Sequence, residues 1–191
     1  MLFRSRIPFP PDRGDRIRSF HFLRHLASKR PVHLIGFVDD DEDRKSAKEL
    51  LPILASLHME VRSKSRLRAG MEALIWGEPV SLMAFSSRRI MQKVDDLLAN
   101  KPIDTIFAYS GQMAQFVPDE RMGRRFIMDF VDVDSEKFAA YGEAEGGVRG
   151  WVHRREGRLL ARYENEVGRW ADVSMFVSEA EASLMAARIW L

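Results

Sequence analysis

The sequence predicts an α/β fold in which a mainly parallel sheet is covered by helices on both faces. Two observations favour this class. Short runs rich in β-branched and aromatic residues alternate with longer amphipathic runs along the whole chain, an order typical of parallel strands joined by crossover helices. Polar loops follow the predicted strands, and the carboxyl ends of parallel strands share one edge of a sheet. We therefore expect any ligand site at that edge.

The predicted strands are short and bounded by turn residues or charge. They are Met1–Phe3, Val32–Val38, Met59–Val61, Asp104–Tyr109, Phe126–Val131 and Val173–Val177. Amphipathic periodicity predicts a first helix that buries Ile17, Phe20, Leu23 and Leu26. Further helices are predicted over 44–57, from Leu67 to Trp76, and over 88–99, 136–142 and 149–170. The helix over 88–99 is expected to be capped by Ser86 or Ser87. Residues 80–86 are expected to form a loop or an extended segment.

Composition limits the class of protein. The 191 residues, 46% of them hydrophobic, fit one domain over 1–191. No apolar run approaches the ~20 residues that cross a bilayer, and the N-terminus lacks a signal peptide, so a cytoplasmic location is expected. The chain has no cysteine and a net charge of +2, which argues against thiolate chemistry and against nucleic acid as a partner. The five histidines have no partner identifiable in the sequence, and we expect them to be structural.

The segment from Arg6 to Ser19 predicts a strand, a proline-rich loop, one glycine and a helix start. Gly14 permits a close approach of the backbone to a ligand, and Asp15 can cap the helix. Free N–H groups at a helix start, aided by Arg13, Arg16 and Arg18, suit a phosphate or a carboxylate. An ordinary strand-to-helix turn explains the same residues.

Two charged stretches each allow two interpretations. The acidic run Asp39–Asp43 could hold a metal ion, but favourable placement at a helix N-terminus explains it better. The basic stretch Arg62–Arg68 leads into an apolar helical stripe that could rest on an anionic membrane. Such a stripe more often faces the core, so we expect it to be buried.

The predicted site joins three loops at the edge of the sheet. Gly14 and Arg16 could hold phosphate, and Ser110 and Gln112 follow the fourth strand; Asp132, Asp134 and Ser135 follow the fifth. Asp132 and Asp134 share a side if strand geometry continues past Phe130. Paired carboxylates can act as acid and base or bind hydroxyl groups. Asp134 or Ser135 could instead cap the following helix, and we favour that role for Asp134 and a functional one for Asp132.

Five segments, taken in order, resemble the N-terminal half of family-4 glycosyltransferases, above all the sugar transferases of exopolysaccharide and exosortase (PEP-CTERM) systems. They are RIPFPPDRGDRIRSFHFLRHLA, WGEPVSL, FIMDFVDVDSEKF, WVHRREGRLLARYE and FVSEAEASL. The resemblance implies one Rossmann-like half of a GT-B fold and a retaining transfer from a nucleotide sugar to a glycan or lipid-linked acceptor, without a cofactor and usually without a metal.

In that family the first glycine loop approaches the donor phosphates, a role that falls on Gly14. Many members carry a functional His after the fifth strand, where this chain has Asp132-Val133-Asp134. The family's donor-binding domain would follow Ser178, so a further domain in cis or in trans is expected for activity, and the chain alone is expected to be inactive. Two alternatives are a non-catalytic binding module for a phosphorylated or glycosylated ligand, and a peripheral protein at the inner face of the cell membrane that uses the arginines of 62–76 and 149–169.

Overall fold

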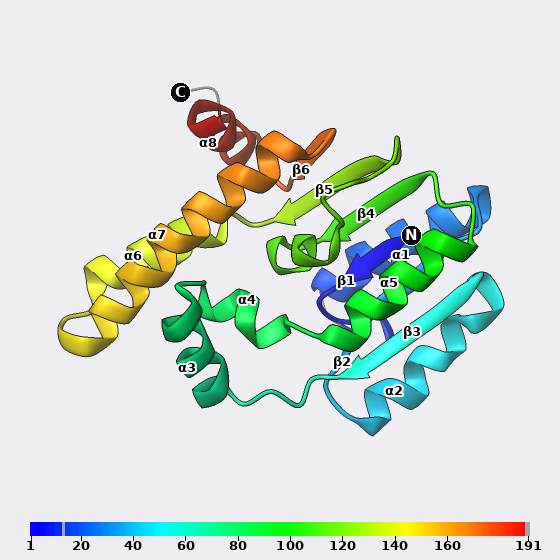
Figure 1. The fold of residues 1–191 in the computed structure, drawn as a ribbon, viewed down its shortest axis with the longest axis horizontal. Helices are drawn as coiled ribbons and strands as arrows, with labels where there is room; N and C mark the ends of the chain where they lie inside the picture. The colour runs from blue at the N-terminus through cyan, green and yellow to red at the C-terminus, as the bar shows by residue number, and fades with distance from the viewer. Residues whose placement is uncertain (13, 190–191) are drawn as a thin grey trace. The chain divides into compact units, whose positions relative to one another are not determined.

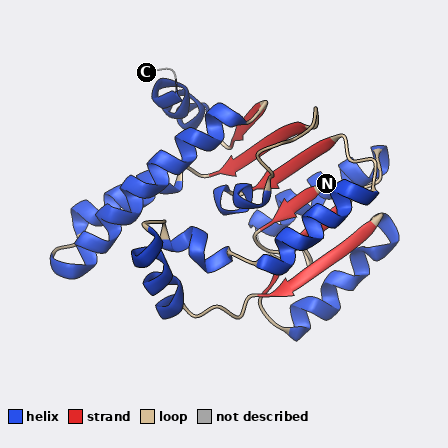
Figure 2. Ribbon diagram, in the orientation of Figure 1, coloured by secondary structure: helices blue, strands red, loops and turns tan. Residues whose placement is uncertain are grey.

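The computed structural model describes residues 1–12 and 14–189. It is an α/β structure with six parallel strands flanked by helices, in the order β3-β2-β1-β4-β5-β6, consistent with a Rossmann-like fold. The predicted fold class is therefore confirmed. The strands, shown in Figure 2, are β1 (Leu2–Arg4), β2 (His33–Val38), β3 (Ser56–Val61), β4 (Thr105–Tyr109), β5 (Arg125–Val131) and β6 (Val173–Phe176).

Helices connect the strands, as Figure 1 shows. The α-helices are α1 (Gly14–Lys29), α2 (Asp41–Ala47), α3 (Arg66–Trp76), α4 (Val80–Phe85), α5 (Arg88–Asn100), α6 (Asp134–Ala144), α7 (Gly147–Trp170) and α8 (Glu179–Ile189), and the 3₁₀ helices are η1 (Lys48–Ile53) and η2 (Gly111–Phe116). None of these helices is both long enough and apolar enough to span a membrane, within the part of the chain that the structure describes.

The chain divides into two compact units, which are described separately below. Unit 1 comprises Met1–Ser63, Ser87–Ala108 and Phe116–Arg125, and unit 2 comprises Lys64–Ser86, Tyr109–Gln115 and Phe126–Leu191.

Unit 1 is built on β1 and β2, whose residues are buried, and on β3, whose residues are half-buried. All six residues of β2 are buried, and β2 pairs in parallel with β1 and with β3. Phe3, Phe37 and Phe116 form an aromatic cluster with ring centroids 6.3 Å apart in each of two pairs. The β-branched and aromatic composition that predicted these strands also supplies their core.

In unit 2, α6 and α7 pack closely because glycines lie at their contact. A Cβ atom added to Gly157 would lie 3.1 Å from the Ala139 nitrogen, and one added to Gly150 would lie 1.9 Å from the Glu145 oxygen. Larger residues would force these backbones apart. β6 pairs in parallel with β5, where the register shifts between Asp129 and Val131.

Several predicted boundaries are wrong, each for a local reason. The helix over 44–57 begins earlier, because the Asp43 N–H donates to Asp40 Oδ1 at 2.8 Å and α2 starts at Asp41. It gives way at Lys48 to the 3₁₀ helix η1, which contains Pro52, a residue without the N–H that an α-helix interior needs. Residues 80–85 form α4, where a loop or extended segment was predicted.

In two helices, α1 and α3, the buried residues also differ from those predicted. In α1 Leu23 is buried as predicted, but Ile17 is 42% exposed, and the buried side also includes Arg16 and Ser19. In α3 the buried residues are Ala69 and Ala73, and the large side chains predicted to be in the core are exposed: Leu67, Met71, Leu74, Ile75 and Trp76.

Candidate functional site

The predicted site residues fall into both units. Gly14, Asp15, Arg16 and Arg18 belong to α1 in unit 1, whereas Ser110, Gln112, Asp132, Asp134 and Ser135 belong to unit 2. Arg13 and the Asp15 side chain, the predicted helix cap, lie outside the described residues. Each group is examined within its own unit.

In unit 1 the Arg16 guanidinium is already neutralised by carboxylates. Its Nη2 donates to both oxygens of Asp43, at 3.1 and 3.2 Å, and its Nη1 lies 3.5 Å from Asp12 Oδ1. Arg16 is only 5% exposed, so this ion pair fastens α1 to α2. Gly14 is the first residue of α1, and a Cβ atom there would meet nothing within 4 Å.

The acidic run lies at the start of α2, as the favoured interpretation predicted. Asp40 caps the helix through the Asp43 N–H, and Asp41, Glu42 and Asp43 occupy the first turn, where carboxylates interact favourably with the helix dipole. Asp39 pairs with Arg6 and lies 3.0 Å from Arg62 Nη2.

In unit 2 two non-glycine residues adopt left-handed backbone conformations beside each other. Ser110 has φ +73° and Val131 has φ +68°, which is unusual for a β-branched residue. Asp129 connects them, since its backbone oxygen accepts from the Ser110 N–H at 2.8 Å and its Oδ1 accepts from the Val131 N–H at 3.1 Å. Backbone strain of this kind gathers at functional sites.

The polar side chains at this turn are only partly satisfied. Ser110 Oγ is buried and has no hydrogen-bond partner among the described residues. The next residue is held in place by Tyr163, whose hydroxyl donates to the Gly111 oxygen at 3.2 Å. Burial raises the pKa of Tyr163 above its ordinary value, so this phenol stays a neutral donor.

Asp132 and Asp134 converge on one ammonium group. Lys137 Nζ lies 3.1 Å from Asp134 Oδ1 and 3.6 Å from Asp132 Oδ2, and Gln112 Nε2 donates to Asp134 Oδ2 at 2.8 Å. Partial burial would lower the pKa of Lys137, but the two carboxylates outweigh it and raise that pKa. Strand geometry ends at Val131, so strand alternation does not place the two aspartates, and their carboxylates meet at Lys137 of α6.

The predicted cap at Asp134 is wrong. The N-cap of α6 is Val133, which offers no side-chain hydrogen bond. Two distant glutamates take this role, because the Ser135 N–H donates to Glu164 Oε1 at 3.0 Å and the Val133 N–H donates to Glu181 Oε1 at 3.3 Å.

Ser135 is buried in a charged cluster that the sequence did not reveal. Its hydroxyl bonds Glu164 Oε2 and accepts from Arg188 Nη1 at 2.9 Å, and Arg188 also pairs with Glu136. Burial raises the pKa of Glu164 to about 7, against the opposing effect of the Ser135 hydrogen bonds.

A cavity of about 480 Å³ opens beside this cluster, within the size range of small-molecule sites. Its walls come from α6, α7 and α8 and include Ser135, Glu136, Trp151, Arg154, Arg158 and Arg188. Arginines with carboxylates and an exposed indole can bind a polar ligand that carries both hydroxyl and anionic groups.

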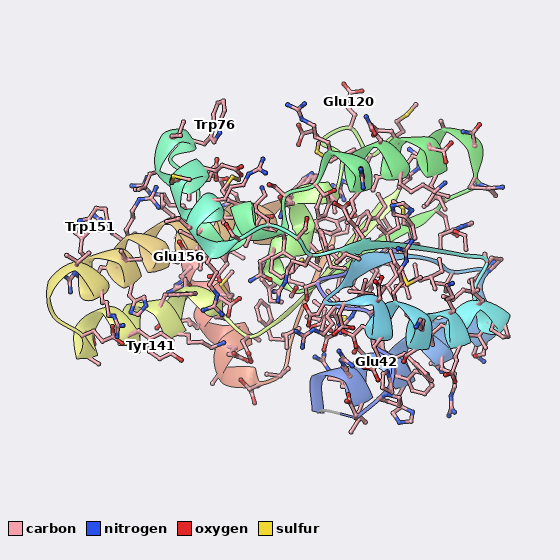
Figure 3. The ribbon with its side chains drawn as sticks, turned by 90° about the horizontal axis from the view of Figure 1, so that it is seen from below. Glu42, Trp76, Glu120, Tyr141, Trp151 and Glu156 are labelled. Atoms are coloured by element: carbon pink, nitrogen blue, oxygen red, sulfur yellow. The ribbon has the colours of Figure 1, made fainter. Side chains whose placement is uncertain are left out.

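Three glutamates join the segments of unit 2. Glu164 and Glu181 hold the start of α6, and Glu156 holds the start of α4; Figure 3 labels Glu156 on α7. Glu156 and Glu164 are each 3% exposed. A signal for these two was present in the sequence, since they lie four residues before and after the buried Leu160, on the same helical stripe.

The free energy of unfolding should depend on pH because Glu164 is buried. Its pKa is about 7 in the folded protein and 4.5 without the fold, so the folded state holds a proton that the unfolded chain has lost. The free energy of unfolding should therefore fall as pH rises from about 4.5 to about 7, by at most about 3 kcal/mol. Urea unfolding at a series of pH values measures this slope.

Glu164→Gln should flatten that slope, because the amide does not titrate. The matched control is Glu166→Gln, at an exposed position on the same helix, which should keep the wild-type slope. An unchanged slope in Glu164→Gln would assign the pH dependence to another group.

Comparison with known proteins identifies no relative: no family model, no curated protein and no solved structure matches this chain.

Proposed function

We propose that this chain is the acceptor-binding half of a glycosyltransferase, which transfers a sugar from a nucleotide-sugar donor to a glycan or lipid-linked acceptor of the cell envelope. The observation that carries the proposal is the polar turn of Ser110, Gln112, Asp132 and Asp134 next to the cavity that begins at Ser135. Sugar hydroxyls need donors and acceptors in such an arrangement, and the arginines suit a phosphate or an acidic sugar.

The five segments that resemble family-4 glycosyltransferases support the same proposal. Four of them meet in unit 2 through three glutamates: the buried Glu156 and Glu164 of the WVHRREGRLLARYE helix bind Ser81 and Ser135, and the half-buried Glu181 binds Val133. These motifs thus share one structural role, which is to position α4 and α6 around α7.

In the proposed reaction the acceptor oxygen bonds the anomeric carbon of the sugar while the bond from that carbon to the diphosphate oxygen breaks, and the acceptor's proton passes to the departing nucleoside diphosphate. Asp132 is our candidate for the hydrogen bond to that hydroxyl, because its side chain is 53% exposed. Asp134 would orient Gln112 and Lys137 toward the acceptor. A donor-binding domain in cis or in trans would deliver the nucleotide sugar.

Binding of acceptors tests the proposal on this chain directly. Short-chain polyprenyl diphosphate sugars and free oligosaccharides are titrated into the protein by ligand-observed NMR, and transfer is then assayed with radiolabelled UDP- and GDP-sugars. Asp132→Ala should weaken acceptor binding by about tenfold with little change in melting temperature, since its carboxylate is exposed. Asp95→Ala, an exposed aspartate of α5, is the matched control.

Three results would count against parts of this proposal. A variant Asp132→Ala that loses stability but not affinity would make Asp132 structural. Binding of phosphorylated or glycosylated ligands with no transfer, even with a donor domain supplied, would favour the binding module. Failure of every acceptor to bind would remove the acceptor assignment.

A further inference from the structure

Most helices of a folded protein pack by their large apolar residues. α3 instead buries small residues and exposes its large apolar ones. Its buried positions are Ala69 and Ala73. Its large apolar side chains are exposed: Leu67 75%, Met71 53%, Leu74 60%, Ile75 76% and Trp76 73%. Leu67, Met71, Leu74 and Ile75 follow helical spacing and so form one stripe. A contiguous exposed apolar patch of this kind marks an interaction surface.

Basic residues lie at the start of this stripe. Lys64, Arg66 and Arg68 precede it or lie in its first turn, and the single acid of α3 is Glu72. Glu72 is already bound by Lys64 Nζ at 2.7 Å and Arg68 Nε at 2.8 Å, and with the exposed Glu78 the segment 64–78 carries one net positive charge. Exposed cations beside an apolar helical stripe complement anionic lipid headgroups above a hydrocarbon layer.

Tryptophans lie at the end of α3 and on the neighbouring helix α7. Trp76 is the last residue of α3, and Gly77 then ends the helix with φ +73°. Arg155 of α7 donates to the Ala73 oxygen at 2.8 Å, and Trp151, one turn earlier in α7, is 50% exposed. Figure 3 shows both indoles projecting away from the ribbon, and indoles favour the headgroup region of a bilayer.

We infer that the exposed stripe of α3, Leu67, Met71, Leu74 and Ile75, together with Trp76 at the end of the helix, docks unit 2 on the surface of an anionic lipid bilayer. The inference stands apart from the proposed glycosyltransferase function. We favour a bilayer over a protein partner because the exposed arginines Arg66 and Arg68 lie at the start of the exposed apolar stripe and complement anionic headgroups. The helix would lie in the interface with its apolar side chains in the acyl region.

Vesicle sedimentation tests this with the whole chain. The protein should sediment with vesicles of phosphatidylcholine and phosphatidylglycerol at low salt, and less with phosphatidylcholine alone or at high salt. Ile75→Ser/Trp76→Ser should weaken binding by at least about tenfold, and Arg66→Gln should weaken it less. Met91→Ser/Met122→Ser, at exposed positions outside α3, is the matched control and should bind like the wild type.

Fluorescence locates the contact. Vesicles should shift the tryptophan emission to shorter wavelength, and Trp76→Phe should lose most of this shift while still sedimenting. No sedimentation of the wild type with anionic vesicles, or equal binding by Ile75→Ser/Trp76→Ser, would overturn the inference. Concentration-dependent self-association that the double variant abolishes, without vesicle binding, would also overturn it and would assign the stripe to an interface between copies of the chain.

Discussion

Gly36→Ala is expected to destabilise unit 1 by about 3 kcal/mol, a large part of the stability of an ordinary domain. Gly36 lies in β2 and pairs with Arg4 of β1. An added Cβ atom would lie 2.6 Å from the Arg4 oxygen and 2.9 Å from Ile7 Cδ1. Backbone cannot move aside as a flexible side chain can, so β1 would have to shift.

Gly14→Ala is the matched control, because a Cβ atom there meets nothing within 4 Å. Alanine also restricts the unfolded chain more than glycine does, so the control should be neutral or slightly stabilising. Urea unfolding followed by far-UV circular dichroism compares the two midpoints. Equal midpoints would show that β1 yields to an alanine at Gly36 at little energetic cost.

Local sequence patterns predicted the structure correctly where it depends on residues close together in the chain. Val32–Val38 was predicted from its β-branched and aromatic residues, and Ser87 accepts from the Ile90 N–H at 3.2 Å as a predicted cap. The acidic run at Asp39–Asp43 behaves as predicted for the same reason, since capping is decided within a few residues.

Prediction failed where distant residues decide the structure. Arg16 is buried because Asp43, 27 residues away, neutralises it, and that ion pair turns Ile17 outward. α3 packs by its alanines and not by its large residues, which periodicity alone cannot distinguish. At the candidate site, the sequence identified Ser110, Gln112, Asp132 and Asp134 as polar residues at strand ends, but not Glu164 and Arg188, which lie 29 and 53 residues from Ser135.

α4 shows this dependence on distant residues most directly, and Glu156→Ala should melt it. The N-cap of α4 is Pro79, which provides no side-chain cap. Glu156 of α7 supplies one instead: its oxygens accept from the Val80 N–H at 2.8 Å, the Ser81 N–H at 2.9 Å and the Ser81 hydroxyl at 2.8 Å. A six-residue helix has too few internal hydrogen bonds to form without such support.

Removing the carboxylate would leave three donors unsatisfied at a nearly buried site, and we expect a loss of about 4 kcal/mol in the free energy of unfolding. Ser81→Ala removes one donor and leaves the two backbone bonds, so it should cost about 1 kcal/mol. Hydrogen exchange at the amides of Val80 and Ser81 would measure the local effect. If those amides stay protected in Glu156→Ala, then packing, and not the carboxylate of α7, holds α4 in its helical form.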